Sequence, residues 1–235
     1  MNELGVIVPA LNEERNIGPL IHRLNAVVPE ARIIVVDNGS TDSTGDEARA
    51  AGAEVIVEPR RGYGFACAAG VRAARGCKVI AFIDADLSFL PEELPGLLAP
   101  ILADQADLVL GSRWLGHIEP GAMPPHQRFG NWLVARLMNR LYGLSITDLG
   151  PYRAITGALM ERLDMREMTY GWPTEMIVKA ARRGARIVEV PVSYHSRHAG
   201  RSKVSGTVRG TLLAAWYILG VTLRYAYGED PGHSR

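Results

Sequence analysis

The segment Lys78-Val79-Ile80-Ala81-Phe82-Ile83-Asp84-Ala85-Asp86 contains an uninterrupted apolar run that ends in two carboxylates. A run of that length bounded by charge predicts a buried strand over residues 78–83. Asp84 and Asp86 then follow the carboxyl end of this strand, where open α/β sheets bind ligands. Because side chains alternate along a strand, the two carboxylates are expected on the same side, which suits Mg²⁺ or Mn²⁺. Asp is also common in polar turns, so the tripeptide alone leaves that alternative open.

Strand and helix patterns alternate along the chain on both sides of this segment. Short apolar runs predict further strands over residues 5–9, 32–36, 53–57, 108–110 and 187–190. Helical spacing and capping residues predict helices over 17–28, 44–51, 65–74, 91–103, 129–141 and 173–183, with another near 158. Strands that alternate with helices indicate an α/β fold with a mixed, mostly parallel sheet flanked by helices.

Two common nucleotide-binding motifs are excluded. Gly62-Tyr63-Gly64 follows the third strand rather than the first, and Cys67 stands where a dinucleotide fingerprint needs its third glycine. The chain also has no Walker lysine motif.

Composition limits the class of protein further. The 235 residues are 47% hydrophobic and 22% charged, as in a globular chain with a sizeable core. The net charge of +1 predicts no bulk attraction to nucleic acid. Cys67 and Cys77 match no metal or redox spacing, and Cys67 is expected to be a small buried hydrophobe in a reducing cytoplasm.

No membrane-spanning segment is predicted. The N-terminus has neither the positive nor the apolar region of a signal peptide. The apolar stretch from Leu212 to Leu223 is shorter than the ~20 residues that a spanning helix needs. A core helix, an oligomer contact and an interfacial helix remain alternatives for it.

Four motifs occur in a fixed order: VIVPALNEE near the N-terminus, VVDNGSTDST after the second strand, DAD, and GSR after the fifth strand. Together they resemble the inverting GT-A glycosyltransferases of family 2. The downstream motifs DLGPYRAI, YGWPTEM, VEVPVSYHSR and GRSKVSGT resemble the branch that contains dolichyl-phosphate mannose synthases and bacterial polyprenyl-phosphate glycosyltransferases. The resemblance covers about residues 4 to 210 and implies a GT-A catalytic domain over 1–205, followed by an apolar helix and tail over 206–235.

The resemblance implies roles for individual residues. The residues that it assigns to the nucleotide sugar are Pro9, Asn12, Glu13, Asp37, Asp42, Gly64, Asp84, Ala85, Asp86, Arg153, Arg197, Arg201 and Lys203. Asp84 and Asp86 are its metal ligands. Arg113, Arg128 and Arg153 would contact the diphosphate or an acceptor phosphate. Asp148 and Glu175 are the candidates for a general base, which a hydroxyl acceptor would require.

Residue-level alternatives remain open for several of these positions. Glu175 also suits the first turn of a helix, and Asp148 suits a turn. Arg128, together with Arg136 and Arg140, could form a solvated helix face.

The chain departs from its relatives at two positions. Ser88 stands where many relatives carry a Gln that contacts metal or phosphate, and Tyr63 stands in the Gly-Lys-Gly loop of many relatives. Each change removes an expected contact to the donor.

The resulting prediction is a metal-dependent transfer of a hexose from GDP-mannose or UDP-glucose to a polyprenyl or dolichyl phosphate, with inversion. An acceptor phosphate is already anionic, so this reaction needs no strong base. The enzyme would act at the cytoplasmic face of the membrane, with the 212–223 helix and the Gly116–Pro125 loop as membrane-proximal elements. The alternatives are a soluble acceptor and a non-catalytic nucleotide-sugar-binding subunit; a homo-oligomer is left open.

Overall fold

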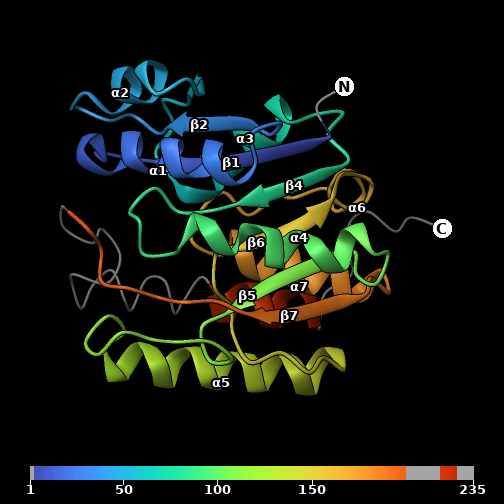
Figure 1. Ribbon diagram of the computed structural model, residues 1–235. Helices are drawn as coiled ribbons and strands as arrows, with labels where there is room; N and C mark the ends of the chain where they lie inside the picture. The colour runs from blue at the N-terminus through green and yellow to red at the C-terminus, as the bar shows by residue number, and fades with distance from the viewer. Residues whose placement is uncertain (1–2, 200–217, 227–235) are drawn as a thin grey trace.

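A seven-stranded sheet with the order β3-β2-β1-β4-β6-β5-β7 forms the centre of the molecule (Figure 1). The computed structural model describes residues 3–199 and 218–226. The strands are β1 (Leu4–Ala10), β2 (Arg32–Asp37), β3 (Glu54–Val57), β4 (Val79–Phe82), β5 (Leu108–Ser112), β6 (Arg153–Thr156) and β7 (Ile187–Pro191).

One strand runs against the other six. β6 pairs antiparallel with β4 on one side and with β5 on the other, whereas the remaining pairs are parallel. The predicted mixed, mostly parallel sheet is therefore confirmed. The sequence did not predict β6, because its four residues Arg-Ala-Ile-Thr are too short for a strand pattern to stand out.

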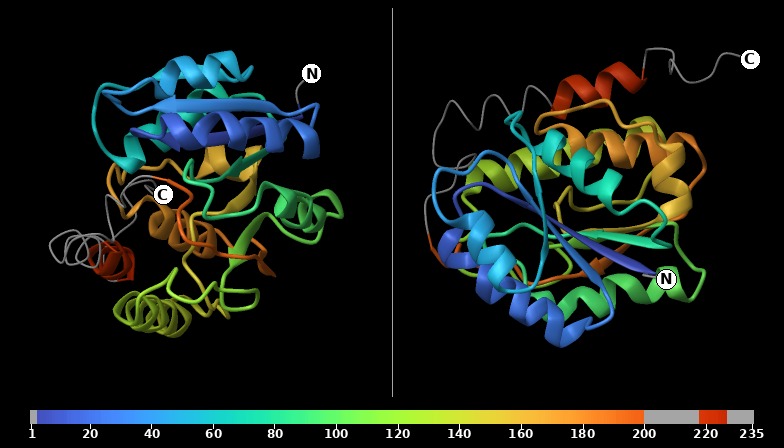
Figure 2. Two further views of the ribbon diagram at one scale, coloured as in Figure 1. Left: turned by 60° about the vertical axis from the view of Figure 1, so that its left-hand side comes forward. Right: turned by 90° about the horizontal axis from the view of Figure 1, so that it is seen from above.

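Helices cover both faces of the sheet (Figure 2). The helices are α1 (Glu14–Val27), α2 (Thr44–Ala50), α3 (Tyr63–Ala73), η1 (Pro91–Glu93), α4 (Leu94–Leu102), α5 (Pro125–Tyr142), α6 (Gly157–Arg162) and α7 (Trp172–Arg182). One apolar core joins the sheet to α1, α2 and α4, and a second joins it to α3, α5, α6 and α7. These three layers bury both faces, as expected for strands with nearly continuous apolar sequences.

The apolar periodicity of the sequence accounts for α1. Ile17, Leu20, Ile21 and Leu24 recur at helical spacing and are all fully buried. The helix ends at Val27, before Pro29.

Helix α5 begins at Pro125, four residues before the predicted start. Proline suits the first helical position, because its missing N–H has no partner there in any case. The segment expected to be a loop therefore ends where this helix starts.

The described part of the C-terminal apolar segment is a helix over 218–226 that packs on the protein's own core. Val221 is 1% exposed and Tyr225 is 7% exposed. The Tyr142 hydroxyl of α5 donates a hydrogen bond to the Thr222 carbonyl at 2.5 Å. Among the described residues, no helix is both long and apolar enough to span a bilayer. Arg201, Lys203 and the predicted boundary at 205/206 lie outside the described residues.

Candidate active site

The predicted site residues follow strands that end at one edge of the sheet. β1, β2 and β4 are parallel, and the register pairs Ala10 with Asp37 at the end of β1. β5 has the same direction as β4, because both run antiparallel to β6. The loops after these four strands therefore meet at the edge where the sequence predicts the ligand site.

The loops after β1 and β2 are tied together through Asn12 and Asp42. Asn12 has a positive φ of 53°; its N–H donates to the Ser40 hydroxyl at 2.9 Å, and its side-chain oxygen accepts from the Thr41 N–H at 2.8 Å. Asp42 accepts hydrogen bonds from the N–H groups of Glu14 and Thr44 at 3.3 and 3.1 Å. These hydrogen bonds give Asn12 and Asp42 a structural role, because they hold the loops after β1 and β2 together at this edge of the sheet.

Asn38 organises the next loop, although it was not among the predicted site residues. Its side-chain N–H groups donate to the carbonyls of Glu58 and Arg60 at 3.0 and 2.7 Å, and its oxygen accepts from the Gly62 N–H at 2.8 Å. The signal in the sequence was a polar residue directly after the end of a strand. Asn38 thereby fixes the loop that carries Tyr63.

The Gly62-Tyr63-Gly64 loop connects this edge to the segment before α7. A Cβ atom at Gly64 would overlap with the backbone of Glu167 and Met168, so only glycine fits this contact. The Tyr63 hydroxyl donates to Oδ1 of Asp84 at 3.2 Å. Tyr63 therefore contacts the predicted metal ligand directly.

Asp84 and Asp86 lie together at the end of β4, as predicted. Burial, followed by the neighbouring charge of Asp86, raises the pKa of Asp84 well above its usual range, although Tyr63, Arg197 and Arg113 oppose this. Ser88 donates to Oδ1 of Asp86 through its N–H at 3.0 Å and through its hydroxyl at 2.6 Å. Ser88 thus orients Asp86.

The donor atoms of this pair suit a hard divalent cation. Two close carboxylates destabilise each other's charge unless a cation lies beside them. Within residues 3–199 and 218–226, no group of three or more His, Cys, Asp or Glu side chains could hold a metal. A cation at Asp84 and Asp86 would therefore need oxygen atoms from water or substrate phosphate, as Mg²⁺ and Mn²⁺ commonly use.

Arg113 and Asp148 form a buried ion pair next to the carboxylates. The Nε and Nη2 atoms of Arg113 lie 2.7 and 2.6 Å from the two oxygens of Asp148, which is fully buried. Burial alone would raise the pKa of Asp148, but the charge and hydrogen bonds of Arg113 hold it below its usual value. The guanidinium of Arg113 also lies 5.1 Å from the centre of the Tyr194 ring. Asp148 is therefore engaged as the partner of Arg113.

Arg128 lies at the start of α5, with its guanidinium 5.8 Å from the centre of the Trp114 ring. Its Nε atom is buried and has no hydrogen-bond partner among the described residues. Trp114 directly follows Arg113, so Arg128 reaches the same part of the edge.

The structure places Arg153 and Glu175 differently from the prediction. Arg153 is 1% exposed, and its guanidinium donates to the backbone carbonyls of Leu149, Gly150 and Pro173. Burial lowers the pKa of Arg153 to about 10. Because both Nη groups donate to carbonyls inside the protein and the Nε atom is buried, Arg153 does not present its donors to a phosphate.

The Glu175 carboxylate is fully buried at the start of α7. It accepts from the N–H groups of Arg166 and Glu167 at 2.9 and 2.8 Å and from the Tyr225 hydroxyl at 2.6 Å. Its Oε1 also lies 3.0 Å from Nζ of Lys179. These contacts correspond to a structural role and leave the carboxylate enclosed rather than open to a substrate hydroxyl.

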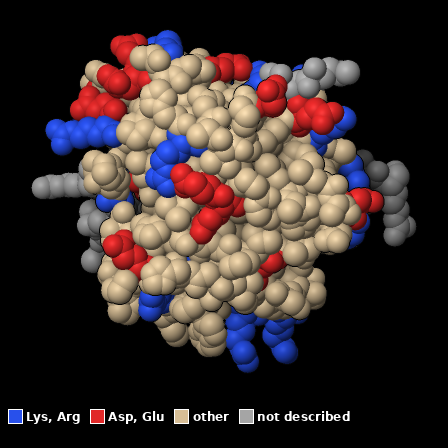
Figure 3. Space-filling model, viewed as in Figure 1, with Lys and Arg blue, Asp and Glu red and all other residues tan. Residues whose placement is uncertain are grey.

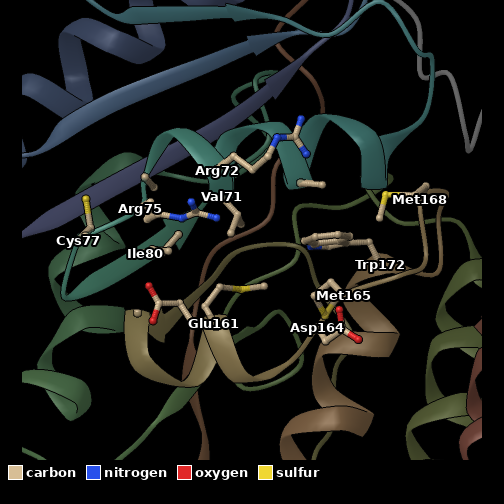
Figure 4. Close-up of a pocket in the computed structure, with 15 residues that line it drawn as sticks. Val71, Arg72, Arg75, Cys77, Ile80, Glu161, Asp164, Met165, Met168 and Trp172 are labelled. Atoms are coloured by element: carbon tan, nitrogen blue, oxygen red, sulfur yellow. The ribbon is translucent and has the colours of Figure 1, made fainter. Parts of the chain in front are cut away.

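A cavity of about 570 Å³ lies between α3, α6 and the segment before α7 (Figure 4). Trp172 lines it and is only 2% exposed, so this side chain belongs to the core. Of the predicted site residues that the structure describes, none lines this cavity.

The sheet order and the residues gathered at its edge define an α/β protein of the nucleotide-sugar transferase class. The chain belongs to glycosyl transferase family 2, whose sequence model matches residues 5–168. It is therefore a glycosyltransferase, as the motifs predicted.

Two relatives and one solved structure illustrate the similarity. An uncharacterized glycosyltransferase of Mycobacterium tuberculosis is 39% identical over 213 residues, covering 89% of this chain and 93% of the relative. The undecaprenyl-phosphate mannosyltransferase of Micrococcus luteus is 36% identical over 216 residues, covering 87% and 88%. The glucosyl-3-phosphoglycerate synthase of M. tuberculosis, solved with Mn²⁺, UDP-glucose and phosphoglyceric acid, superposes with a TM-score of 0.76 at 25% identity, covering 98% of this chain and 82% of that chain.

Proposed function

We propose that this glycosyltransferase moves a hexose from a nucleotide diphosphate sugar to a polyprenyl phosphate, with inversion at the anomeric carbon. The observation that carries the proposal is the similarity to the undecaprenyl-phosphate mannosyltransferase over nearly the full length of both chains. The donor is GDP-mannose or UDP-glucose, and the reaction takes place at the cytoplasmic face of the membrane.

Asp84 and Asp86 would hold Mg²⁺ or Mn²⁺ together with the donor diphosphate. Such an ion supplies positive charge where the departing nucleotide gains negative charge. The structural neighbour solved with Mn²⁺ and UDP-glucose supports this assignment. Tyr63 and Ser88 orient the two carboxylates through the hydrogen bonds described above.

The acceptor phosphate would lie against Arg113 and Arg128. Asp148 holds the guanidinium of Arg113 in a fixed orientation. The Nε atom of Arg128, which has no partner within residues 3–199 and 218–226, can donate to a phosphate oxygen. A phosphate monoester is already ionised near neutral pH, so it attacks without a strong base. The engagement of both Asp148 and Glu175 in buried contacts agrees with this mechanism.

An apolar surface on α5 and the turn after β5 supports a lipid acceptor. We call it the α5 surface; it consists of Trp114, Leu115, Phe129, Trp132 and Leu133, which are 40–61% exposed. Phe129, Trp132 and Leu133 have the i, i+3, i+4 spacing of one helix face, and Trp114 joins them to the site through Arg113. Exposed aromatic residues grouped in this way are typical of interfacial helices.

The charge on α5 favours an anionic membrane. Helix α5 contains Arg128, Arg136 and Arg140 and no Asp or Glu. In the space-filling view, blue atoms project along the lower edge of the molecule, where α5 runs (Figure 3). We therefore assign membrane contact to α5 instead of the 212–223 helix, whose described part packs on the core.

The acceptor is tested by incubating the purified protein with labelled GDP-mannose or UDP-glucose and Mn²⁺. Undecaprenyl phosphate in detergent and 3-phosphoglycerate are supplied in separate reactions. We expect label in the organic phase with one donor and only with the lipid. Label transferred to 3-phosphoglycerate instead would contradict the proposal and favour a soluble acceptor, as in the structural neighbour.

Membrane contact is tested by sedimentation with vesicles that contain phosphatidylglycerol. Replacing Trp132 and Leu133 by Ser is expected to reduce the bound fraction severalfold. Leu102→Ser is the matched control, because Leu102 is 74% exposed on α4, on the opposite face of the sheet. Equal binding of all three proteins would exclude α5 as the contact.

A further inference from the structure

The guanidinium of Arg197 joins two carboxylates at the proposed cation site. Its Nη1 atom lies 2.8 and 3.0 Å from the two oxygens of Glu13, and its Nη2 atom lies 3.1 Å from Oδ2 of Asp86. The side chains of Arg197, Asp86 and Glu13 are 19%, 17% and 5% exposed. Since water largely does not reach this bridge, its charges interact more strongly than those of a surface ion pair.

Both oxygens of Asp86 are engaged in this arrangement. Oδ1 accepts two hydrogen bonds from Ser88, and Oδ2 faces Arg197. A divalent cation on Asp86 would lie beside the guanidinium, where two positive centres repel each other. Binding of the cation therefore requires Arg197 to leave Oδ2.

The backbone around Arg197 is fastened to the same loop. The His195 N–H donates to the Ser88 carbonyl at 2.8 Å, and the His198 N–H donates to the Asp86 carbonyl at 3.3 Å. On the other side, Asn16 donates from its side chain to the Ala199 carbonyl at 3.2 Å. A displacement of Arg197 is thus coupled to the position of residues 195–199.

We propose that Arg197 is a resident counter-ion, which occupies the cation position on Asp86 until a divalent cation displaces it. The exchange couples cation binding to release of the 195–199 segment and frees the guanidinium to bind an anion. The inference rests on the cation site of the proposed function, but it concerns the protein without nucleotide or acceptor.

The test measures Mn²⁺ binding to the protein without nucleotide, from the loss of the free Mn²⁺ signal in electron paramagnetic resonance. Arg197→Gln is expected to bind Mn²⁺ about tenfold more tightly than the unchanged protein, within the range typical of coupling between two bound species. Arg197→Lys keeps the charge, but lysine has no planar fork that could bind both carboxylates. The Mn²⁺ affinity of this variant should therefore lie between those of the unchanged protein and Arg197→Gln. Adding Asp86→Asn to Arg197→Gln should abolish the gain.

Two controls separate ion exchange from a general effect of charge. Arg60→Gln also removes one positive charge near this edge, where Arg60 pairs with Glu58, and should leave the Mn²⁺ affinity unchanged. Hydrogen exchange of residues 195–199 should increase when Mn²⁺ is added to the unchanged protein.

An unchanged or weaker Mn²⁺ affinity in Arg197→Gln would overturn the inference, as would an equal gain in Arg60→Gln. Hexose transfer to the lipid is measured in a separate assay. A failure of the ion-exchange inference would change the Mn²⁺ results, whereas a failure of the proposed function would change the transfer results.

Discussion

Replacing Glu175 is the clearest test of whether this buried carboxylate is catalytic or structural. We predict that Glu175→Gln destabilises the protein, because the variant keeps one oxygen acceptor but turns an amide N–H₂ toward Lys179 or toward the N–H groups of Arg166 and Glu167. Breaking a buried ion pair from one side costs about 3–5 kcal/mol. An unfolding entropy of about 2.1 cal/mol/K per residue amounts to about 0.5 kcal/mol/K for a chain of this length. A destabilisation of about 3 kcal/mol therefore corresponds to a Tm loss of about 6 °C.

The assay is thermal unfolding followed by circular dichroism, together with transferase activity at a temperature where both proteins are folded. Replacing Lys179 by Met in the same protein removes the unpaired charge and should restore part of the lost Tm. Activity per folded molecule should remain within about tenfold of the unchanged enzyme. A Tm within about 1 °C of the unchanged protein, combined with an activity loss of more than about 100-fold, would refute this reasoning and restore Glu175 as a general base.

Three further predictions concern the edge of the sheet. Hydrogen bonds from Arg60 lower the pKa of Glu58 to about 2, so Glu58 stabilises the fold above pH 4.5 and this contribution is lost as the pH falls from about 4.5 to about 2. Since Arg60 is 59% exposed, we expect Glu58→Gln to cost no more than about 1 kcal/mol at pH 7. Urea unfolding should show this difference shrinking toward pH 2, and a constant difference would contradict the assignment. Gly64→Ala should cost about 1–3 kcal/mol in the same measurement, because its Cβ meets backbone atoms, whereas the open position Gly96→Ala should cost nothing. Arg113→Lys should lower kcat about 100-fold with little change in the donor KM, because lysine cannot hold Asp148 and a phosphate with a planar fork; an unchanged kcat would remove Arg113 from the phosphate site.

Local patterns in the sequence were sufficient to predict most of the sheet and the edge that carries Asp84 and Asp86. Apolar runs and helical spacing depend on neighbouring residues, and these are visible in one chain. The ordered motifs at strand ends were sufficient to identify the family, which the match over residues 5–168 confirms.

Residues whose roles depend on distant partners were harder to predict. The partner of Asp148 is Arg113, 35 positions away, and the hydroxyl that binds Glu175 comes from Tyr225, 50 positions away. No local pattern distinguishes a buried Arg153 bound to carbonyls from an exposed arginine that binds phosphate. Burial, rather than residue type, decides which of these charged side chains can reach a substrate.

The position of β6 has a consequence for how the chain folds. β4 and β5 are not hydrogen-bonded to each other in the sheet. Strand β6, residues 153–156, lies between them and pairs with both. During synthesis β5 emerges before its two neighbours β6 and β7, so a nascent chain that ends before residue 153 leaves one edge of β4 and both edges of β5 unpaired. Such edges invite association with other chains. The four-residue strand β6 is therefore the step that joins β5 to the rest of the sheet, and the exposed edge of β4 is covered only once it has docked.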